Sequence, residues 1–153
     1  MKKLRIYLDT SVIGGCFDDE FNEYSNKLFE TFLSSINIAI ISSTTLSELA
    51  NAPLKVREKV TEIPQGCYEE IFVSSEMNSL ADAYIGEKIV TPKYFDDALH
   101  IAIATVLKVD LLVSWNFKHI VNFEKISRFN AVNVREGYGH LEIRTPRDVV
   151  END

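Results

Sequence analysis

Short, continuous apolar runs alternate with segments of helical periodicity along this chain, and this alternation constrains the fold most strongly. The runs cover residues 4–8 (LRIYL, interrupted only by the arginine), residues 38–41 (IAII) and residues 111–114 (LLVS). Runs this short are typical of strands that are buried on both faces of a sheet. Strands that alternate with helices form parallel sheets covered by helices, so we expect an α/β fold. A last core strand is predicted at residues 131–134 (AVNV).

The segments between these runs predict helices of different kinds. Residues 24–34 and 75–88 carry apolar side chains at helical spacing, and residues 121–130 are predicted to form a short helix. Thr91 and Pro92 together form a typical helix start, because proline is favoured in the first turn. The helix that follows contains ALHIAIATVL. This segment is apolar almost all round, so we expect it at the centre of the fold.

The size and charge of the chain limit its function. Its 153 residues fit one domain, spanning residues 1–153, and its net charge is −7. That charge argues against a protein that coats nucleic acid through its overall field, although residues 124–147 are locally richer in arginine and lysine. No apolar stretch reaches the roughly 20 residues of a membrane span, and no cleavable signal is expected. Cys16 and Cys67 lack metal-ligand spacing and are expected to be reduced thiols of a cytoplasmic protein. The polar end, residues 142–153, is expected to wrap over the surface.

Oxygen-bearing side chains occur where strands give way to helices. Asp9 follows the first strand, Glu48 lies in the helix after IAII, and Asp97 lies at the start of the apolar helix. Asn116 follows LLVS. The carboxyl ends of parallel strands meet at one edge of the sheet, where ligands of such folds bind. We therefore expect these side chains to converge there.

Each of these acids also has an ordinary structural explanation. Glu48 is in capping-box register with Thr45, and Asp9 could cap the next helix. Asp96 and Asp97 could interact with a helix dipole. Clustered and partly desolvated carboxylates, however, need a cation, and no lysine or arginine is adjacent in sequence. Oxygen ligands favour Mg²⁺ or Mn²⁺, so a divalent cation is the predicted partner.

Four motifs in order, YLDTSV, TTLSELA, FDDALHIAIA and LLVSWNFKHI, resemble the PIN-domain family, and in particular VapC-like toxin ribonucleases. The resemblance covers residues 4–134. It implies a three-layer α/β sandwich with a central, mainly parallel sheet of four to five strands. It also implies metal-dependent hydrolysis of RNA phosphodiester bonds by an endoribonuclease, the toxin of a type II toxin–antitoxin pair. A cognate antitoxin and a homodimer are further partners that the resemblance implies.

The resemblance assigns roles to individual residues. Asp9, Glu48 and Asp97 match the acids that bind the metal and act in catalysis, whereas Asp96 does not match. Ser11 matches a small polar residue that supports the site. Asn116 stands where many members carry a fourth acid or an asparagine. The resemblance therefore leaves open whether the site binds one metal ion or two. In this scheme a metal-activated water attacks the phosphodiester, and Asn116 orients a water or a phosphate.

The residues around these motifs carry further expectations. Trp115, Lys118 and His119 follow the third apolar run, where they could contact RNA by stacking and phosphate pairing. Core packing is an equally good reading of Trp115, and His100 is expected to be packed or to support the acids. Two glycines, Gly14 and Gly15, follow the first motif; they are expected only to let the chain bend away.

Other functions fit the sequence less well. A phosphatase of the haloacid-dehalogenase type needs a second acid two residues after the first, and Ser11 stands there. A serine hydrolase would be expected to carry Gly-x-Ser-x-Gly, which is absent from the sequence. The alternative that stays open is a catalytically weakened PIN-like module that binds RNA or protein, because Asn116 replaces an acid.

Overall fold

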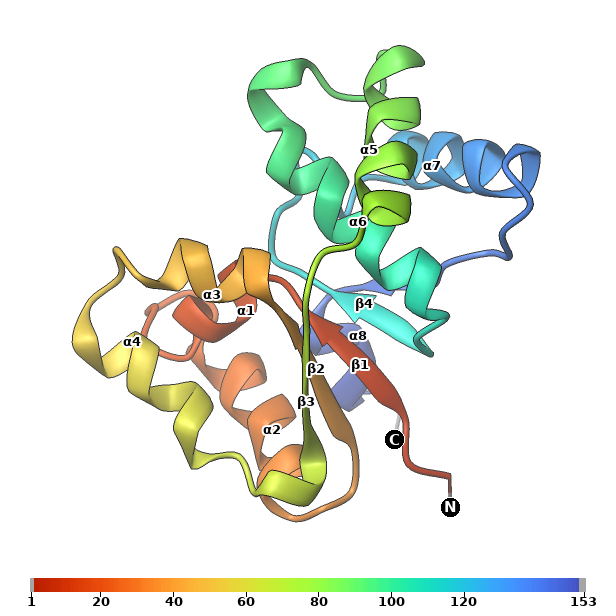
Figure 1. The fold of residues 1–153 in the computed structure, drawn as a ribbon. Coiled ribbons are helices and arrows are strands. Elements are labelled where there is room, and N and C mark those ends of the chain that lie inside the picture. The colour runs from red at the N-terminus through yellow and green to blue at the C-terminus, as the bar shows by residue number, and fades with distance from the viewer. Residues whose placement is uncertain (1, 152–153) are drawn as a thin grey trace.

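Five parallel strands form the central sheet of the computed structural model, which describes residues 2–151 (Figure 1). The strands lie in the order β3-β2-β1-β4-β5, and every neighbouring pair is parallel. The strands are β1 (Arg5–Leu8), β2 (Ile38–Ser42), β3 (Tyr68–Ile71), β4 (Leu111–Val113) and β5 (Ile143–Arg144). The predicted α/β class and the parallel sheet are therefore confirmed.

Eight α-helices and three short 3₁₀ turns connect and cover the strands within residues 2–151. The helices are α1 (Thr10–Gly15), α2 (Asn22–Leu33), α3 (Ser43–Leu49), α4 (Leu54–Lys59), α5 (Ser75–Gly86), α6 (Phe95–Leu107), α7 (Phe123–Arg135) and α8 (Pro146–Glu151). The 3₁₀ turns are η1 (Val60–Glu62), η2 (Gln65–Cys67) and η3 (Pro92–Tyr94). In this part of the chain, no helix is long and apolar enough to cross a membrane.

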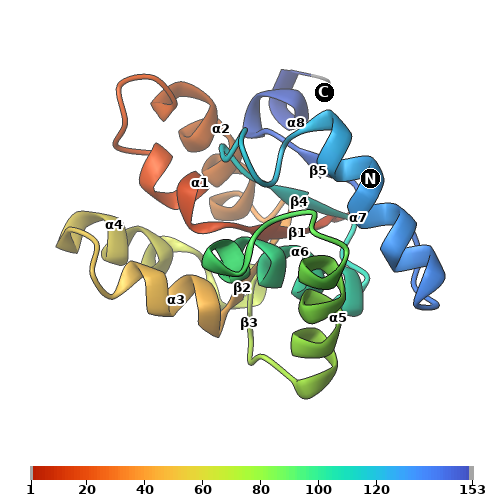
Figure 2. The ribbon, with the colours of Figure 1, turned by 90° about the horizontal axis from the view of Figure 1, so that it is seen from above.

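Two hydrophobic cores lie on opposite faces of the sheet, as the alternation of side chains along a strand requires. In β1, Tyr7 faces the core formed with α5, α6 and α7, whereas Ile6 and Leu8 face the core formed with α1 and α2. Figures 1 and 2 show these two groups of helices on either side of the sheet. Helix α6 is buried along almost its whole length, from Ala98 to Thr105, which confirms its predicted central position.

The predicted strand at residues 131–134 is wrong, because these residues form the end of α7. Their alternating apolar pattern reflects a helix that buries Val132 and Asn133 and leaves Val134 exposed. Helix α7 thus extends beyond the short helix predicted at residues 121–130. The last strand is β5 instead, which pairs with β4 through Ile143 and Arg144.

The end of the chain is built into the fold, contrary to the expectation that residues 142–153 wrap over the surface. It supplies strand β5 and then helix α8, which packs against α2. The hydroxyl of Tyr24 in α2 donates a hydrogen bond of 2.8 Å to Glu151 in α8. Residues 152–153 lie outside the described part of the chain.

The start of the central helix also differs from the prediction. Thr91 and Pro92 begin the 3₁₀ turn η3 rather than α6 itself, which begins three residues later at Phe95. Tyr94 is therefore the last residue of η3 and lies two residues before Asp96.

Both cysteines are buried and free. Burial raises the pKa of the Cys16 thiol to about 11, so this thiol stays protonated at neutral pH. Cys67 lies in the same core, and the absence of a disulfide between the two cysteines agrees with the expected reduced thiols.

Gly15 permits a close approach that the sequence did not reveal. A Cβ atom at this position would lie 2.6 Å from Ser25 Oγ and 2.8 Å from Trp115 Nε1. These two atoms are joined by a hydrogen bond of 2.8 Å, so an added methyl group would separate them. A Cβ at Gly14, by contrast, would meet nothing within 4 Å.

We therefore expect Gly15→Ala to lower the free energy of unfolding by about 2–4 kcal/mol, through overpacking and the lost hydrogen bond. Gly14→Ala, one residue away in the same helix, is the matched control. It is expected to leave stability unchanged or to raise it by ~0.5–1 kcal/mol, because alanine favours helices. Urea unfolding of both variants measures the difference, and equal stabilities would contradict the packing role of Gly15.

Candidate functional site

The carboxyl ends of β1 and β4 meet at one edge of the sheet, where the predicted acids gather. Asp9 directly follows β1, and its backbone N–H donates to the carbonyl oxygen of Val113 at the end of β4 (3.3 Å). Strand β2 leads into α3, which carries Glu48, and α6 begins with the turn that contains Asp97. The topology thus brings the three predicted acids to one place.

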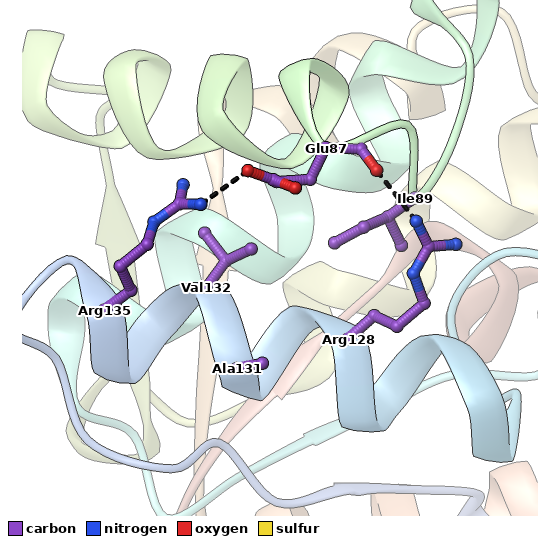
Figure 3. A pocket seen from close by; sticks show the side chains of 6 residues that line it. All are labelled: Glu87, Ile89, Arg128, Ala131, Val132 and Arg135. Carbon is purple, nitrogen blue, oxygen red and sulfur yellow. Dashed lines mark hydrogen bonds and ion pairs between the residues drawn. The ribbon is translucent and has the colours of Figure 1, made fainter.

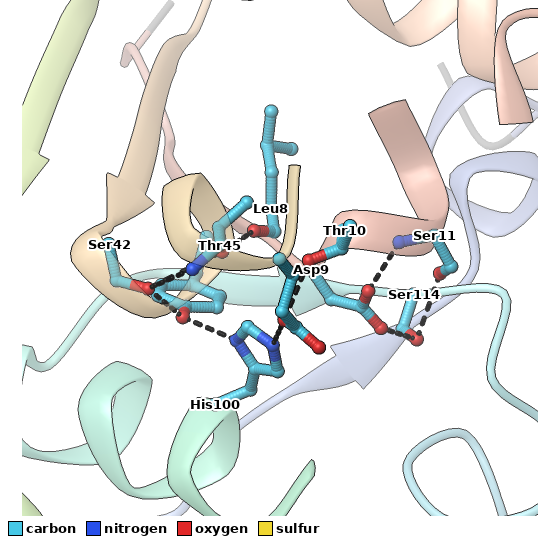
Figure 4. Close-up of polar contacts among 10 residues, drawn as sticks. Leu8, Asp9, Thr10, Ser11, Ser42, Thr45, His100 and Ser114 are labelled. Carbon is cyan, nitrogen blue, oxygen red and sulfur yellow. Dashed lines mark hydrogen bonds and ion pairs between the residues drawn. The ribbon is translucent and has the colours of Figure 1, made fainter. Parts of the chain in front are cut away.

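Asp9 is both a helix cap and a buried acid. Its Oδ1 accepts from the backbone N–H of Ser11 at 2.5 Å, which caps α1, and its Oδ2 accepts from the hydroxyl of Ser114 (Figure 4). The side chain is almost fully buried. The capping alternative for Asp9 is therefore correct, and it is compatible with a place in the acid cluster.

Ser11 ties α1 to the segment after β4. Its hydroxyl oxygen accepts from the backbone N–H of Trp115 at 2.8 Å and lies 3.4 Å from Ser114 Oγ. Ser114 in turn accepts from the backbone N–H of Asn116 at 2.9 Å. Through these hydrogen bonds the two serines connect Asp9 to the segment that carries Asn116.

The capping-box interpretation of Glu48 is wrong. Helix α3 starts at Ser43, one residue after its cap Ser42, so Glu48 lies in the last turn rather than the first. The hydroxyl of Ser42 accepts from the backbone N–H of Thr45 at 3.2 Å. Because Ser42 already caps the helix, Glu48 is free to take part in the acid site.

Glu48 is held through one of its two carboxylate oxygens. Its Oε1 accepts from the hydroxyl of Thr10 at 2.7 Å and lies 2.6 Å from Nε2 of His100. Burial alone would raise the pKa of Glu48, but the hydrogen bonds from His100 and Thr10 lower it below its ordinary value. Among the described residues, no hydrogen bond reaches Oε2, which leaves that oxygen available to a ligand.

His100 stands at the head of a buried chain of hydrogen bonds (Figure 4). The hydroxyl of Thr45 donates to the carbonyl of Leu8 at 3.2 Å, so its oxygen can only accept from Ser42 at 3.3 Å. Ser42 therefore accepts from the hydroxyl of Tyr7 at 2.7 Å. Tyr7 in turn must accept from Nδ1 of His100 at 2.6 Å. The directions along the chain place a proton on Nδ1.

The other ring nitrogen of His100 also carries a proton. Nε2 faces the carboxylate of Glu48, which can only accept when it is ionised. Burial opposes the charge, but Tyr7, Glu48 and the nearby Asp9 raise the pKa of His100 well above its ordinary value. His100 is thus a buried imidazolium paired with Glu48, and its expected supporting position beside the acids is what the structure shows.

The pKa of Asp97 shows the effect of the neighbouring acids. Burial and the negative charges of Asp9 and Glu48 raise its pKa to about 6, although His100 and a hydrogen bond from Asn116 act in the opposite direction. Mutual repulsion of this kind requires that the three carboxylates lie near one another. The adjacent Asp96 is exposed and lines a polar groove along α3, which Glu48 also lines.

The side-chain amide of Asn116 makes hydrogen bonds on two sides. Its Oδ1 accepts from the backbone N–H groups of Lys118 (3.2 Å) and His119 (2.9 Å), which closes the turn after β4. Its side chain also hydrogen-bonds Asp97 and lowers the pKa of that acid. Because Oδ1 is committed to the turn, Asn116 presents a neutral donor to the cluster.

The cluster is not assembled as a finished metal site. Within residues 2–151, no group of three or more His, Cys, Asp or Glu side chains is arranged to hold a metal ion. The oxygens of Asp9 are used by Ser11 and Ser114, and Oε1 of Glu48 is used by Thr10 and His100. The chemistry of the donor set still fits a hard divalent cation, since every candidate ligand is an oxygen and the acids repel one another.

The three residues predicted to contact RNA differ in accessibility. Trp115 is only 8% exposed, stacks on Phe21 with ring centroids 4.4 Å apart, and donates to Ser25, so its role is core packing. Lys118 is exposed. The ring of His119 is largely buried against Tyr94, at a centroid distance of 3.9 Å. For Trp115, these contacts support the core-packing reading over the RNA contact.

Sequence reasoning missed several polar residues at this site, namely Tyr7, Thr10, Ser42 and Ser114. Ser42 directly follows one predicted strand and Ser114 ends another, and these positions are a usable signal. Tyr7 lies within an apolar run, and no neighbouring residue in the sequence indicates that its hydroxyl reaches His100 in α6. Its role depends on the approach of two elements that are far apart in sequence.

A second hollow, of about 240 Å³, lies away from the acids, between the end of α5 and helix α7 (Figure 3). Glu87 accepts hydrogen bonds from both arginines that line this pocket. Its carboxylate binds Arg135 at 2.5 Å, and its carbonyl oxygen accepts from Arg128 at 2.8 Å. The charged residues that line this pocket are therefore paired with one another, and Glu87 is the one acid among them.

No family model matches the chain, and no curated protein matches it. Solved structures do match it. VapBC2 from Rickettsia felis, bound to a DNA fragment from its promoter, is 18% identical with a TM-score of 0.58, over 93% of this chain and 98% of that one. The Mycobacterium tuberculosis toxin VapC20, which cleaves the sarcin–ricin loop, is 15% identical with a TM-score of 0.57, over 89% and 98% of the two chains. A toxin–antitoxin complex from Klebsiella pneumoniae is 19% identical with a TM-score of 0.56, over 74% and 88%. The resemblance seen in the motifs is confirmed at the level of architecture: the chain has the PIN-like fold of VapC toxins.

Proposed function

We propose that this chain is a metal-dependent endoribonuclease that hydrolyses RNA phosphodiester bonds. The observation that carries the proposal is the convergence of Asp9, Glu48 and Asp97 at one edge of the sheet. There the charges of Asp9 and Glu48 raise the pKa of Asp97. Such an excess of negative charge is costly without a cation, and it lies where ligands of parallel sheets bind. A perturbed acid among other acids is typical of a functional site.

Mg²⁺ or Mn²⁺ is the cofactor that suits these oxygen ligands. Asp9, Asp97 and Oε2 of Glu48, which accepts no hydrogen bond within the described residues, would hold it. When bound, such an ion lowers the pKa of a coordinated water and neutralises charge on phosphoryl oxygens. Thr10 and His100 hold Glu48 through its other oxygen, so the chain fixes one ligand before the ion arrives.

Asn116 limits the negative charge of the site, because it is a neutral amide. A fourth acid at this position would add repulsion to Asp97, whereas the amide donates to it. This arrangement favours one tightly bound ion over two. The catalytically weakened binding module is the competing function, and an absence of cleavage by the metal-loaded protein would favour it.

The test is cleavage of RNA in Mg²⁺ or Mn²⁺, with EDTA as the metal-free reference. Asp9→Asn is expected to reduce the cleavage rate at least 100-fold, because it removes a ligand of the ion. Asp19→Asn, an exposed aspartate beyond α1, is the matched control and should cleave like the parent. Equal rates for the Asp9 variant and the parent would defeat the proposed mechanism.

The stabilisation of the protein by Mn²⁺ should depend on pH in a defined direction. Asp97 has a pKa of about 6 in the metal-free protein, so it binds a proton as the pH falls through that value. The proton competes with the ion, and the increase in melting temperature caused by Mn²⁺ is expected to be large at pH 7.5 and small at pH 5. A thermal shift that is the same at both pH values would contradict the assignment of Asp97.

We also propose that the protein is a toxin paired with an antitoxin, and that it forms a homodimer. The similar structures from Rickettsia felis and Klebsiella pneumoniae contain toxin–antitoxin complexes, and this supports the first proposal. Co-expression with small proteins encoded next to its gene should yield a stable complex. Recovery of the chain alone from every such pair would argue against the pairing. The molar mass measured by light scattering would show whether the protein is a homodimer.

A further inference from the structure

A cationic aromatic surface lies beside the acid cluster. It comprises Lys93 and Tyr94 from the turn before α6, and Lys118 and His119 from the turn after β4; we call it the Tyr94 surface. The ammonium groups of Lys93 and Lys118 lie 5.5 Å and 5.8 Å from the centroid of the Tyr94 ring. The ring of His119 packs on the same tyrosine at 3.9 Å. Two positive charges from distant parts of the sequence thus meet at one aromatic side chain.

Behind Tyr94, the His119 ring carries a buried polar atom without a partner. The residue is 9% exposed, and its Nδ1 is buried and has no hydrogen-bond partner within the described residues. Burial and the charges of Lys125 and Lys118 lower the pKa of His119, so the ring is neutral. Buried polar atoms without partners are rare and indicate a missing contact, such as a ligand or a water.

The Tyr94 surface is connected to the acids on both of its sides. Tyr94 lies three residues before Asp97, at the cap position of α6. The backbone N–H groups of Lys118 and His119 donate to Asn116, whose side chain hydrogen-bonds Asp97. A ligand on this surface therefore lies next to any substrate atom held at the acids.

We propose that the Tyr94 surface binds the backbone and one base of a single-stranded RNA immediately beside the bond that is cleaved. Lys93 and Lys118 contact flanking phosphates, and the partly exposed Tyr94 ring, backed by His119, stacks on a base. This inference rests on the proposed function and adds the position of the substrate strand.

The charge distribution explains why a surface of this kind is needed. The chain carries a net charge of −7 and concentrates further acids at the site, so its overall field repels RNA. Local lysines must then supply the phosphate contacts. Stacking on an aromatic side chain requires a base that has left a duplex, which favours a single strand over double-stranded nucleic acid.

The experiment measures binding separately from cleavage. A 5′-labelled single-stranded RNA oligonucleotide is titrated in EDTA with the Asp97→Asn protein, and fluorescence anisotropy gives the affinity as a function of salt. Replacing both Lys93 and Lys118 by glutamine is expected to weaken binding at least 10-fold. The slope of log K against log salt should fall by about 1.4, since each phosphate contact on a single strand contributes about 0.7.

Matched controls are available elsewhere on the chain. Lys27 lies 5.4 Å from the Tyr24 ring and Lys55 lies 5.2 Å from the Phe17 ring, and both lysines are exposed. The double variant Lys27→Gln/Lys55→Gln removes the same charge and the same type of contact, and it should leave the affinity within twofold. Tyr94→Leu should weaken binding at least fivefold and leave the salt slope unchanged, because stacking neutralises no phosphate.

The outcomes separate this inference from the proposed function. Equal affinities for the Lys93/Lys118 pair and the control pair would overturn the inference, as would equal affinity for a DNA duplex or the absence of RNA binding. Cleavage by the parent with a KM unchanged by the lysine substitutions would overturn the inference and leave the nuclease intact. Lysine-dependent binding without any cleavage would support the surface while defeating the nuclease.

Discussion

Asp97→Asn is expected to stabilise the metal-free protein at pH 7.5 and to abolish the further stabilisation by Mn²⁺. The pKa of Asp97 rises from the ordinary value of 3.8 to about 6 in the folded protein. An acid whose pKa is higher in the folded state opposes folding when it is ionised, so the metal-free parent loses stability as the pH rises from about 4 through about 6. Asparagine removes that penalty.

The expected magnitude follows from the same shift. A change from 3.8 to about 6 corresponds to about 3 kcal/mol, and partial exposure of the side chain reduces this to ~1–2 kcal/mol. The melting temperature of the variant in EDTA should rise by roughly 3–6 °C. In Mn²⁺ the parent should gain further stability and the variant none, because the ion has lost a ligand.

Asp96→Asn is the matched control for this experiment, since it removes the same charge from the preceding, exposed residue of α6. It should change the melting temperature in EDTA by less than about 2 °C and retain the response to Mn²⁺. If Asp97→Asn instead lowers the stability of the metal-free protein, the three carboxylates do not repel one another as described.

His100→Leu is expected to be the most destabilising single change at the site. It breaks a buried ion pair with Glu48 and leaves the hydroxyl of Tyr7 without its donor. Breaking such pairs costs about 3–5 kcal/mol when the remaining charge stays buried. The side chain of Glu48 is 34% exposed and can regain water, so we expect a loss of about 2–3 kcal/mol in urea unfolding.

A double-mutant cycle distinguishes the hydrogen-bond chain from simple packing. Tyr7→Phe leaves Nδ1 of His100 unsatisfied and should cost about 1–3 kcal/mol. Combined with His100→Leu, it should cost less than the sum of the two, because both changes remove the same bond. Additive losses would show that the two side chains act independently, and His140→Leu, at an exposed histidine, should change stability by less than about 0.5 kcal/mol.

The central strands were predictable because burial on both faces leaves a recognisable apolar run. The edge strand β3 was not, since its sequence YEEI is only partly buried and looks like a polar connection. Strand β5 is two residues long and has no pattern at all. The run AVNV was misread because a strand and the last turn of an amphipathic helix can share the same short alternation.

The site was predictable in its acids and not in their partners. Parallel topology alone directs residues after β1 and β4 to one edge, which is why Asp9 and Asn116 could be placed together. The link from His100 to Tyr7 joins residues 93 positions apart and depends on how α6 crosses β1. No local sequence signal reports a contact of that kind.

The two outer strands also determine how copies of this chain can meet. Exposed sheet edges invite strand pairing between molecules, which leads to aggregation. Here β3 carries Glu69 and Glu70 at one edge, and β5 offers only two residues at the other. Charge and shortness are two means by which natural proteins block such pairing. Association between copies is therefore expected to use helix surfaces, and the sheet should stay unpaired in concentrated solution.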